Sequence, residues 1–266
     1  MEKIVLKGLV FLGLFFGVYF SLQQIDWMNL FHIQQTTESN EQKIGELIWK
    51  SYSQSETLVY DSLVTDAIDS LLQAVCESND MDASKIKLHI IQNPEVNAFA
   101  LPNSHLIIYT GLITECENET ELCGVMAHEL AHMELDHVMK KMVKEIGLAT
   151  LVSMTAGNGA GQVVISSIKH LTSSAYDRNL EKEADIKAVD YLVNAHLDPE
   201  QFANFMFRLG DKENEADKYL QWVNTHPNSS ERAAYIITYN LTKPHGSFEL
   251  VLSETTWEEM QFISGY

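Results

Sequence analysis

The sequence predicts an α+β protein: a mostly helical domain with a small antiparallel sheet, behind an N-terminal transmembrane helix. Three observations carry this prediction. Apolar residues recur at helical spacing over most of the chain, three short strand-like runs lie between residues 86 and 110, and residues 8–25 carry no charge. With 266 residues, of which 45% are hydrophobic, the chain can form one sizeable core.

The N-terminal segment is expected to anchor the chain in a membrane. Gly8 to Ile25 are 18 consecutive uncharged residues, the length of a short transmembrane helix. An uncleaved anchor is favoured over a cleaved signal peptide, because no small-residue cleavage site follows. Lys3 and Lys7 precede the run and Asp26 follows it, which predicts a cytoplasmic N-terminus. The main domain should then lie on the non-cytoplasmic side, which is the periplasm in a Gram-negative bacterium.

The first part of the domain is expected to contain one or two helices followed by three strands. Between Glu41 and Glu77, apolar residues recur at helical spacing. Strands are expected at Ile86 to Gln92, Asn97 to Leu101 and His105 to Thr110, because these runs are apolar or alternating and turn residues separate them. We expect them to pair antiparallel.

The next helix carries a pattern typical of a metal site. Residues 128–132 form an H-E-x-x-H sequence inside an apolar helical run, and Asn118 with Glu121 predicts a capped helix start. Two histidines four apart on a helix lie about 40° apart around its axis, so His128 and His132 can both reach one Zn²⁺ ion. Glu129, on the flank of that face, can take a proton from a water molecule at the metal. This arrangement suits hydrolysis.

A catalytic zinc site needs a third protein ligand, and the sequence offers two candidates. His137 follows His132 by five residues, whereas a third histidine of this motif class stands at the sixth position. We therefore expect His137 to lie on the surface or to support a ligand from behind. Glu181 is the better candidate, since Asp185 lies four residues on, where it can accept a hydrogen bond from a ligating imidazole. Glu183 is expected on the solvated surface.

The uncharged run from Ile146 to Ile168 is expected to form two buried helices joined by a glycine turn. It has 23 residues, but Gly157 to Gly161 interrupts it and leaves 11 residues before and 7 after, too few to cross about 30 Å of hydrocarbon. Peripheral insertion of this hairpin into a bilayer is the alternative. Farther on, Asp198-Pro199 predicts a helix start and Gly210 its end.

Four motifs stand in order between residues 85 and 232: Asn97-Ala98-Phe99-Ala100-Leu101-Pro102, the H-E-x-x-H sequence, Arg178 followed by Glu181-x-Glu183-Ala184-Asp185, and His226-Pro227 followed by Arg232. Together they resemble the CAAX-prenyl-endopeptidase and HtpX-like family of membrane-associated zinc metallopeptidases, which are gluzincins. Two places depart from the family pattern. Asn103 and Ser104 stand where a glycine pair is common, and Asp177 stands where a serine is usual. Neither departure affects a ligand.

The resemblance implies a zincin-type metallopeptidase domain with one Zn²⁺ ion. It implies three metal ligands, His128, His132 and Glu181, supported from behind by Asp185, Arg178 and Arg232. By the same resemblance Glu129 and His226 are catalytic. His226 would face the metal from the far side, where it could stabilise the oxyanion or occupy the open ligand position of the zinc. The alternative is that His226 is only a structural residue of a capped turn.

The resemblance also implies how a polypeptide substrate binds. In gluzincins an edge strand beside the zinc helix pairs with extended peptide, and here the matching residues are Asn97, Ala98, Phe99 and Ala100. For Asn97, ordinary hydrogen bonding at a strand end is the alternative.

Charge and cysteine content limit the partners. The formal net charge is −19, which argues against nucleic acid and against an electrostatic hold on anionic lipid. The partners expected are a polypeptide substrate and the membrane that holds the anchor. Cys76, Cys116 and Cys123 lack metal-ligand spacing and are expected to be buried free thiols, with one bridged pair as the alternative.

The expected organisation is a membrane anchor at residues 1–25, a linker at 26–40, a metallopeptidase domain at 41–243 and a C-terminal tail at 244–266. The expected function is a membrane-anchored zinc metalloendopeptidase acting on unfolded or misassembled envelope proteins. One alternative is a non-catalytic anchored adaptor or chaperone, although a structural zinc would not need the base Glu129. A hydrolase of non-peptide amides is another alternative.

Overall fold

The computed structural model describes residues 33–155, 160–212, 222, 224–244 and 246–265. The chain divides into two compact units, residues 1–41 and 42–266. The helices and strands in chain order are α3 (Ile33–Ser53), α4 (Ser62–Glu77), the 3₁₀ helix η1 (Ala83–Lys85), β1 (Lys87–Ile91), β2 (Ala98–Leu101), β3 (His105–Tyr109), α5 (Thr110–Glu115), α6 (Glu119–Glu134), α7 (His137–Ile146), α8 (Leu148–Thr155), α9 (Ala160–Ser173), α10 (Arg178–Asn194), α11 (Pro199–Lys212), α13 (Ser229–Asn240) and α14 (Glu254–Ser264).

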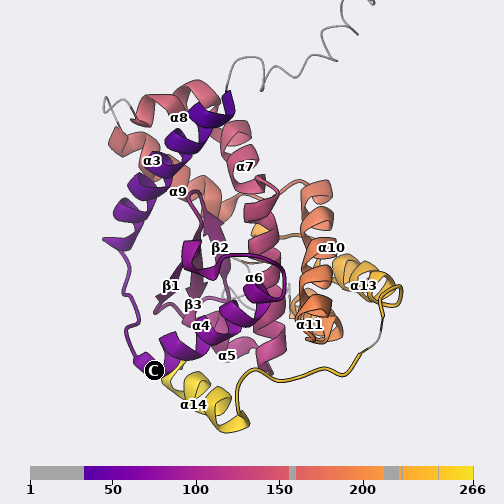
Figure 1. Ribbon diagram of the computed structural model, residues 1–266. Helices are drawn as coiled ribbons and strands as arrows, with labels where there is room; N and C mark the ends of the chain where they lie inside the picture. Colours follow the sequence, from indigo (N-terminus) through magenta and orange to yellow (C-terminus); the bar gives the residue numbers. More distant parts are fainter. Residues whose placement is uncertain (1–32, 156–159, 213–221, 223, 245, 266) are drawn as a thin grey trace, which may run out of the picture. The chain divides into compact units, whose positions relative to one another are not determined.

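Helix α6 lies between the sheet and a group formed by α10, α11 and α13 (Figure 1). Its residues from Glu119 to His132 are all buried, so the helix is covered on every side. Gly124 explains how closely α11 approaches: a Cβ atom there would lie 2.5 Å from the Cβ of Phe202. Only glycine allows this contact. The helix that carries H-E-x-x-H is therefore the centre of the unit.

The N-terminus of α6 is capped as predicted. The Asn118 side chain accepts a hydrogen bond from the Glu121 N–H at 3.0 Å, and the Glu121 carboxylate accepts one from the Glu117 N–H at 2.7 Å. Arg208 of α11 donates to the same buried carboxylate at 2.7 Å. Glu121 therefore both caps the helix and pairs with a charge on a neighbouring helix.

The sheet is mixed, so the prediction of an antiparallel sheet was wrong. The strand order is β1-β3-β2, with β2 antiparallel and β1 parallel to β3. After β1 the chain passes through residues 92–97 to the far edge, forms β2, and turns back into the middle as β3. The strand-like runs and the turn residues predicted where the strands lie. They did not predict that the loop of residues 92–97 passes over the end of β3.

The turn between β2 and β3 forms with Asn103 and Ser104 in place of the family's glycine pair. Asn103 and Ser104 adopt φ angles of 66° and 58°, in the left-handed region. Asparagine tolerates this region better than most residues do, because its short polar side chain bonds locally. The hairpin thus forms without glycine, and β2 stays at the edge of the sheet, where α6 and α9 contact it.

The uncharged run forms two helices as predicted, α8 and α9, but they are amphipathic instead of buried all round. Leu151 and Met154 lie in the core, whereas Leu148, Val152 and Ile165 are exposed. The expected glycine turn falls largely on residues 156–159, outside the described residues. Each helix therefore covers the core with one face only.

Helix α11 begins at Pro199 as predicted, but Gly210 does not end it, because the helix runs on to Lys212. A Cβ atom at Gly210 would lie 2.2 Å from the Oγ of Ser230. The glycine therefore lets α11 and α13 pack closely. A glycine selected for close packing and one selected to end a helix look the same in sequence.

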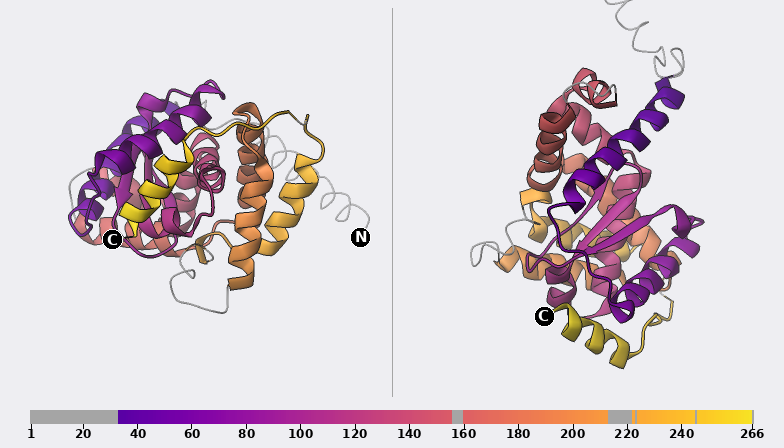
Figure 2. Two further views of the ribbon diagram at one scale, coloured as in Figure 1. Left: turned by 90° about the horizontal axis from the view of Figure 1, so that it is seen from below. Right: turned by 90° about the vertical axis from the view of Figure 1, so that its left-hand side faces the viewer.

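The segment expected as a C-terminal tail packs against the domain. Helix α14 lies beside α4 and also contacts α5 (Figure 2). The buried Glu119 carboxylate accepts a hydrogen bond from the Leu252 N–H at 2.9 Å, and the Gln261 side chain donates to the Cys116 carbonyl at 2.6 Å. These contacts tie the C-terminal segment to the start of α6.

The membrane prediction falls outside the described residues. Among the helices that the structure describes, none is both long and apolar enough to cross a membrane. The expected anchor, Gly8 to Ile25, and residues 26–32 of the expected linker are not described. Cys76, Cys116 and Cys123 are all buried and free, which confirms the expected thiols.

Candidate metal centre and active site

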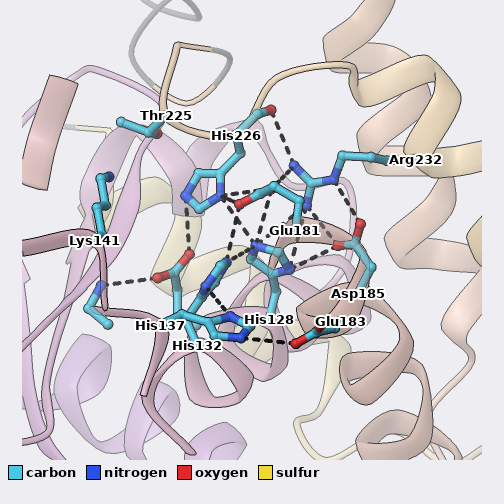
Figure 3. Close-up of polar contacts among 12 residues, drawn as sticks. His128, His132, His137, Lys141, Glu181, Glu183, Asp185, Thr225, His226 and Arg232 are labelled. Carbon is cyan, nitrogen blue, oxygen red and sulfur yellow. Dashed lines mark hydrogen bonds and ion pairs between the residues drawn. The ribbon is translucent and has the colours of Figure 1, made fainter. Parts of the chain in front are cut away.

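Four buried side chains converge beside α6 and form what we call the metal group. His128 and His132 come from α6, Glu181 from α10, and His226 from the segment before α13 (Figure 3). One possible ligand atom from each lies within 4.8 Å of the corresponding atoms of the other three. None of the four residues is more than 2% exposed. The structure thus brings together the two helix histidines and the third ligand that the sequence predicted.

The donor atoms of the metal group point inward. The Nε2 atoms of His128 and His132 are 3.0 Å apart, and His132 Nε2 lies 3.3 Å from Glu181 Oε1. His226 Nδ1 is 3.0 Å from the same carboxylate oxygen and 3.2 Å from His128 Nε2. This set of two or three imidazole nitrogens and one carboxylate is typical of a tetrahedral zinc site.

The outer sides of the two α6 histidines indicate which ring nitrogens are left for a metal. His128 Nδ1 lies 2.9 Å from the Asp185 carboxylate, and a neutral imidazole bonded to a carboxylate carries its proton on that nitrogen. His132 Nδ1 lies 3.1 Å from His137 Nδ1. With its Nδ1 donating outward, His128 turns its Nε2 lone pair into a buried space that also holds His132 Nε2 and the ionised Glu181 carboxylate. A cation satisfies this arrangement, so the residues fit a Zn²⁺ ion.

Arg232 holds two buried carboxylates in place. Its Nε and Nη2 atoms donate to the two oxygens of Asp185 at 2.8 and 2.7 Å, and Nη1 lies 2.6 Å from Glu181 Oε2. Burial raises the pKa of Asp185, but the Arg232 charge outweighs it and holds that pKa at about 2. The pKa of Glu181 is likewise well below its usual range, against the effect of burial. Both groups therefore stay ionised at neutral pH.

Glu129 lies between the metal group and the sheet edge. Its Oε2 atom accepts a hydrogen bond from the Ala100 N–H at 3.0 Å, and Oε1 lies 3.5 Å from His226 Nε2. Burial, opposed by the nearby His128 and reinforced by Glu181, raises the pKa of Glu129 from 4.5 to about 7. A carboxylate with this pKa can both accept and return a proton near neutral pH.

The residues expected to bind substrate lie beside the site, but they are buried. Asn97 precedes β2, and Ala98, Phe99 and Ala100 belong to it, each no more than 4% exposed. The Phe99 ring packs edge-on against Tyr52, whereas the Ala100 backbone N–H reaches Glu129. Neither side-chain polar atom of Asn97 has a hydrogen-bond partner among the residues that the structure describes. Their contact with substrate stays a prediction.

Arg178 is the one predicted support that stands apart from the ligands. It is exposed at the first turn of α10 and lines a cavity of about 230 Å³ that also borders Glu181 and Arg232. Within the described part of the chain, it makes no hydrogen bond or ion pair with the metal group. Its proposed role as a support therefore stays a prediction.

Sequence patterns did not indicate the aromatic residues around the metal group. The Tyr176 ring stacks on His132 with 4.0 Å between centroids, and Trp222 stacks on His226 at 4.2 Å. Lys141 of α7 lies over the Tyr176 ring at 4.0 Å. Tyr176 precedes α10, and no periodicity marks such a position. Only its place directly before the Arg178 motif could have suggested it.

Comparison with known proteins identifies the family. Residues 62–239 match the family model described as Peptidase family M48. The chain belongs to peptidase family M48. This membership confirms the resemblance drawn from the four motifs, and the M48 match contains the whole metal group and Glu129.

Relatives of this M48 chain include named proteases. The beta-barrel assembly-enhancing protease of Yersinia pestis is 26% identical over 227 residues, covering 77% of this chain and 45% of that protein. The mitochondrial metalloendopeptidase OMA1 of Schizosaccharomyces pombe is 27% identical over 167 residues, covering 62% of this chain and 50% of that protein. The beta-barrel assembly-enhancing protease of Escherichia coli K12 is 26% identical over 208 residues. The chain thus spans about half the length of the curated relatives it matches.

Proposed function

We propose that this chain is a membrane-anchored, zinc-dependent metalloendopeptidase that hydrolyses peptide bonds of unfolded or misassembled envelope proteins. The observation that carries the proposal is the convergence of His128, His132 and Glu181 beside the buried carboxylate of Glu129. Two relatives support it by their names, one as a protease that enhances β-barrel assembly and one as a mitochondrial metalloendopeptidase.

His128, His132 and Glu181 are the proposed ligands of one Zn²⁺ ion. When bound there, zinc would supply Lewis-acid polarisation of the scissile carbonyl. Asp185 fixes the orientation of His128 through its Nδ1 atom, and Arg232 in turn fixes Asp185 by a two-point contact. The ligands are thus held by charged groups that are themselves buried and paired.

Glu129 is the proposed general base. Its Oε2 atom is held by the Ala100 N–H, whereas Oε1 has no hydrogen-bond partner among the described residues. That oxygen is therefore available to take a proton from the attacking water. Because burial raises the pKa of Glu129 to about 7, the protonated carboxyl can then give the proton to the leaving amine.

His226 is proposed to stabilise the negative oxygen that develops during the reaction. Its ring lies within the metal group, next to both Glu129 and Glu181. Burial lowers the pKa of His226 to about 4, so the ring is neutral near pH 7 and carries one N–H donor and one lone pair. With the lone pair turned inward, the same ring would occupy the open ligand position while no substrate is bound.

The substrate is proposed to pair with the edge strand β2 as an extended chain. Pairing through the backbone of Asn97 to Ala100 selects for unpaired, extended segments more than for particular side chains. Unfolded proteins offer such segments. The N-terminal run Gly8 to Ile25, with Lys3 and Lys7 before it, is proposed to hold the domain on the non-cytoplasmic side.

Digestion of an unfolded outer-membrane protein by the full chain, with and without a chelator, tests the activity. We expect fragments that disappear with chelator, return with added zinc, and are absent for Glu129→Gln. Binding of the unfolded protein without fragments would contradict the proposal in favour of an adaptor. Cleavage of small amides alone would contradict it in favour of a non-peptide hydrolase.

Protease accessibility tests the location. Protease added outside intact spheroplasts should digest the domain while a cytoplasmic control protein survives. A domain protected in spheroplasts but exposed in inverted vesicles would place it in the cytoplasm. The proposed role in the envelope would then be wrong, although the zinc chemistry would be unaffected.

A further inference from the structure

His137 lies against the back of a proposed ligand, which is one of the two places that the sequence left open for it. Five residues along a continuous helix correspond to about 140° around the axis, so it would point away from His132. The chain does not continue as one helix: α6 ends, Asp136 takes a left-handed φ of 57°, and α7 begins at His137. This turn brings the fully buried His137 ring back to His132, with the two Nδ1 atoms 3.1 Å apart.

The directions of the hydrogen bonds follow from the proposed metal site. His132 Nε2 faces the metal group, so its lone pair is needed there and its proton lies on Nδ1. His132 Nδ1 therefore donates to His137 Nδ1. A neutral His137 that accepts at Nδ1 carries its own proton on Nε2, and that atom lies 3.4 Å from the Glu183 carboxylate (Figure 3). His137 therefore hydrogen-bonds to His132 on one side, and on the other it lies at ion-pair distance from Glu183 without the geometry of a hydrogen bond.

The two α6 ligands are supported differently. His128 donates to the buried Asp185 carboxylate, which Arg232 neutralises. His132 contacts the His137 imidazole, whose other nitrogen lies near Glu183, a residue with 59% of its side chain exposed. His137 is not itself placed to ligate, because it contacts the outer nitrogen of His132. It is not one of the four residues of the metal group. Glu183 is exposed, as the sequence predicted, and its carboxylate also lies 3.4 Å from His137.

We propose that His137, oriented by Glu183, is a positioning residue that fixes the ring orientation and the tautomer of the metal ligand His132. This inference rests on the proposed zinc site. In the H-E-x-x-H-x-x-x-x-H sequence, the last histidine would thus support the second histidine from behind. Ligating histidines generally donate their other N–H to such an acceptor, and losing it typically costs about 10–100-fold in metal affinity.

Two nearly isosteric variants of the full chain separate positioning from packing. Asparagine at position 137 keeps a hydrogen-bond acceptor near the position of Nδ1. Leucine has nearly the same shape as asparagine but offers no acceptor. We expect His137→Leu to weaken zinc binding by about 10–100-fold in competition with a chromophoric chelator, and His137→Asn to restore most of that loss. Equal zinc affinity of the leucine, asparagine and parent chains would overturn the proposal, as would equal weakening by both variants.

A second pair of variants does not disturb the core. Glu183→Gln changes the exposed carboxylate near His137, and Asp190→Asn makes the matching charge change farther along α10, where Asp190 pairs with Lys243. With cobalt in place of zinc, we expect Glu183→Gln to alter the visible absorption bands and to weaken binding several-fold, and Asp190→Asn to match the parent. Identical spectra and affinities for both variants would overturn the role of Glu183.

The outcome for the parent chain separates this inference from the proposed function. If the parent binds no stoichiometric zinc, the proposed metal site falls and the positioning role falls with it. If the parent binds zinc tightly and His137→Leu binds it equally well, only the positioning role is wrong.

Discussion

The substitution Glu129→Gln should stabilise the metal-free protein while removing its activity. Glu129 is fully buried, and within the described part of the chain its carboxylate receives one hydrogen bond, from the Ala100 N–H. Glutamine keeps an oxygen for this N–H and carries no charge. The variant therefore relieves the cost of burying an ionised group and loses the base that the proposed reaction needs.

The magnitude follows from the raised pKa of Glu129, about 7 compared with 4.5. A carboxyl whose pKa is higher in the folded state stabilises the fold below pH 4.5 and loses that contribution as the pH rises to about 7. One pKa unit corresponds to about 1.4 kcal/mol, so the loss above pH 7 is about 3 kcal/mol. The gain from Glu129→Gln should therefore grow from about 1 kcal/mol at pH 5 to about 3 kcal/mol at pH 8.

Urea denaturation in the presence of a chelator, at pH 5 and at pH 8, measures this gain. Glu134→Gln is the matched control on the same helix, because Lys187 and Tyr191 lower the pKa of Glu134 against the effect of burial. Neutralising that partly exposed carboxylate should therefore destabilise the protein, by no more than about 1 kcal/mol. If Glu129→Gln gave no gain at pH 8, or the same gain at both pH values, the account of Glu129 as a buried, destabilised carboxylate would be wrong.

Three further substitutions test other parts of the structure. Glu181→Ala should lower the zinc content of the purified protein well below one equivalent by metal analysis; full occupancy would mean that the third ligand was chosen wrongly. Arg232→Leu should destabilise the protein by about 3–5 kcal/mol in urea denaturation, because it leaves the buried Asp185 carboxylate without its countercharge; a loss below about 1 kcal/mol would refute that pairing. Gly124→Ala should cost about 1–3 kcal/mol, because the added methyl group would collide with Phe202; an unchanged unfolding midpoint would contradict the close packing of α6 on α11.

Local patterns predicted the parts of the site that lie on single helices. His128 and His132 share one helix face, and so do Glu181 and Asp185, because a spacing of four residues fixes both faces. The structure then brings the two faces together, which the spacing alone could not predict. The cap of α6 was also predictable, since Asn118 and Glu121 act within one turn.

Features that depend on contacts between distant segments were missed or mistaken. The sheet is mixed because the chain crosses from β1 to the far edge of the sheet before β2 and β3 form their hairpin. Strand-like runs in a sequence carry no information about the order of the strands in the sheet. Gly210 lets α11 and α13 pack closely and does not end a helix. For His137 the sequence left two places open, the surface or the back of a ligand, and the left-handed conformation of Asp136 decides for the second.

Anomalous diffraction at the zinc absorption edge, from crystals of the zinc-loaded protein, tests the central claim most directly. We expect one peak within about 2.0–2.2 Å of His128 Nε2, His132 Nε2 and a Glu181 carboxylate oxygen, and no peak within bonding distance of His137. A peak bound by His137, or one lacking Glu181, would contradict the site on which the proposed hydrolysis depends.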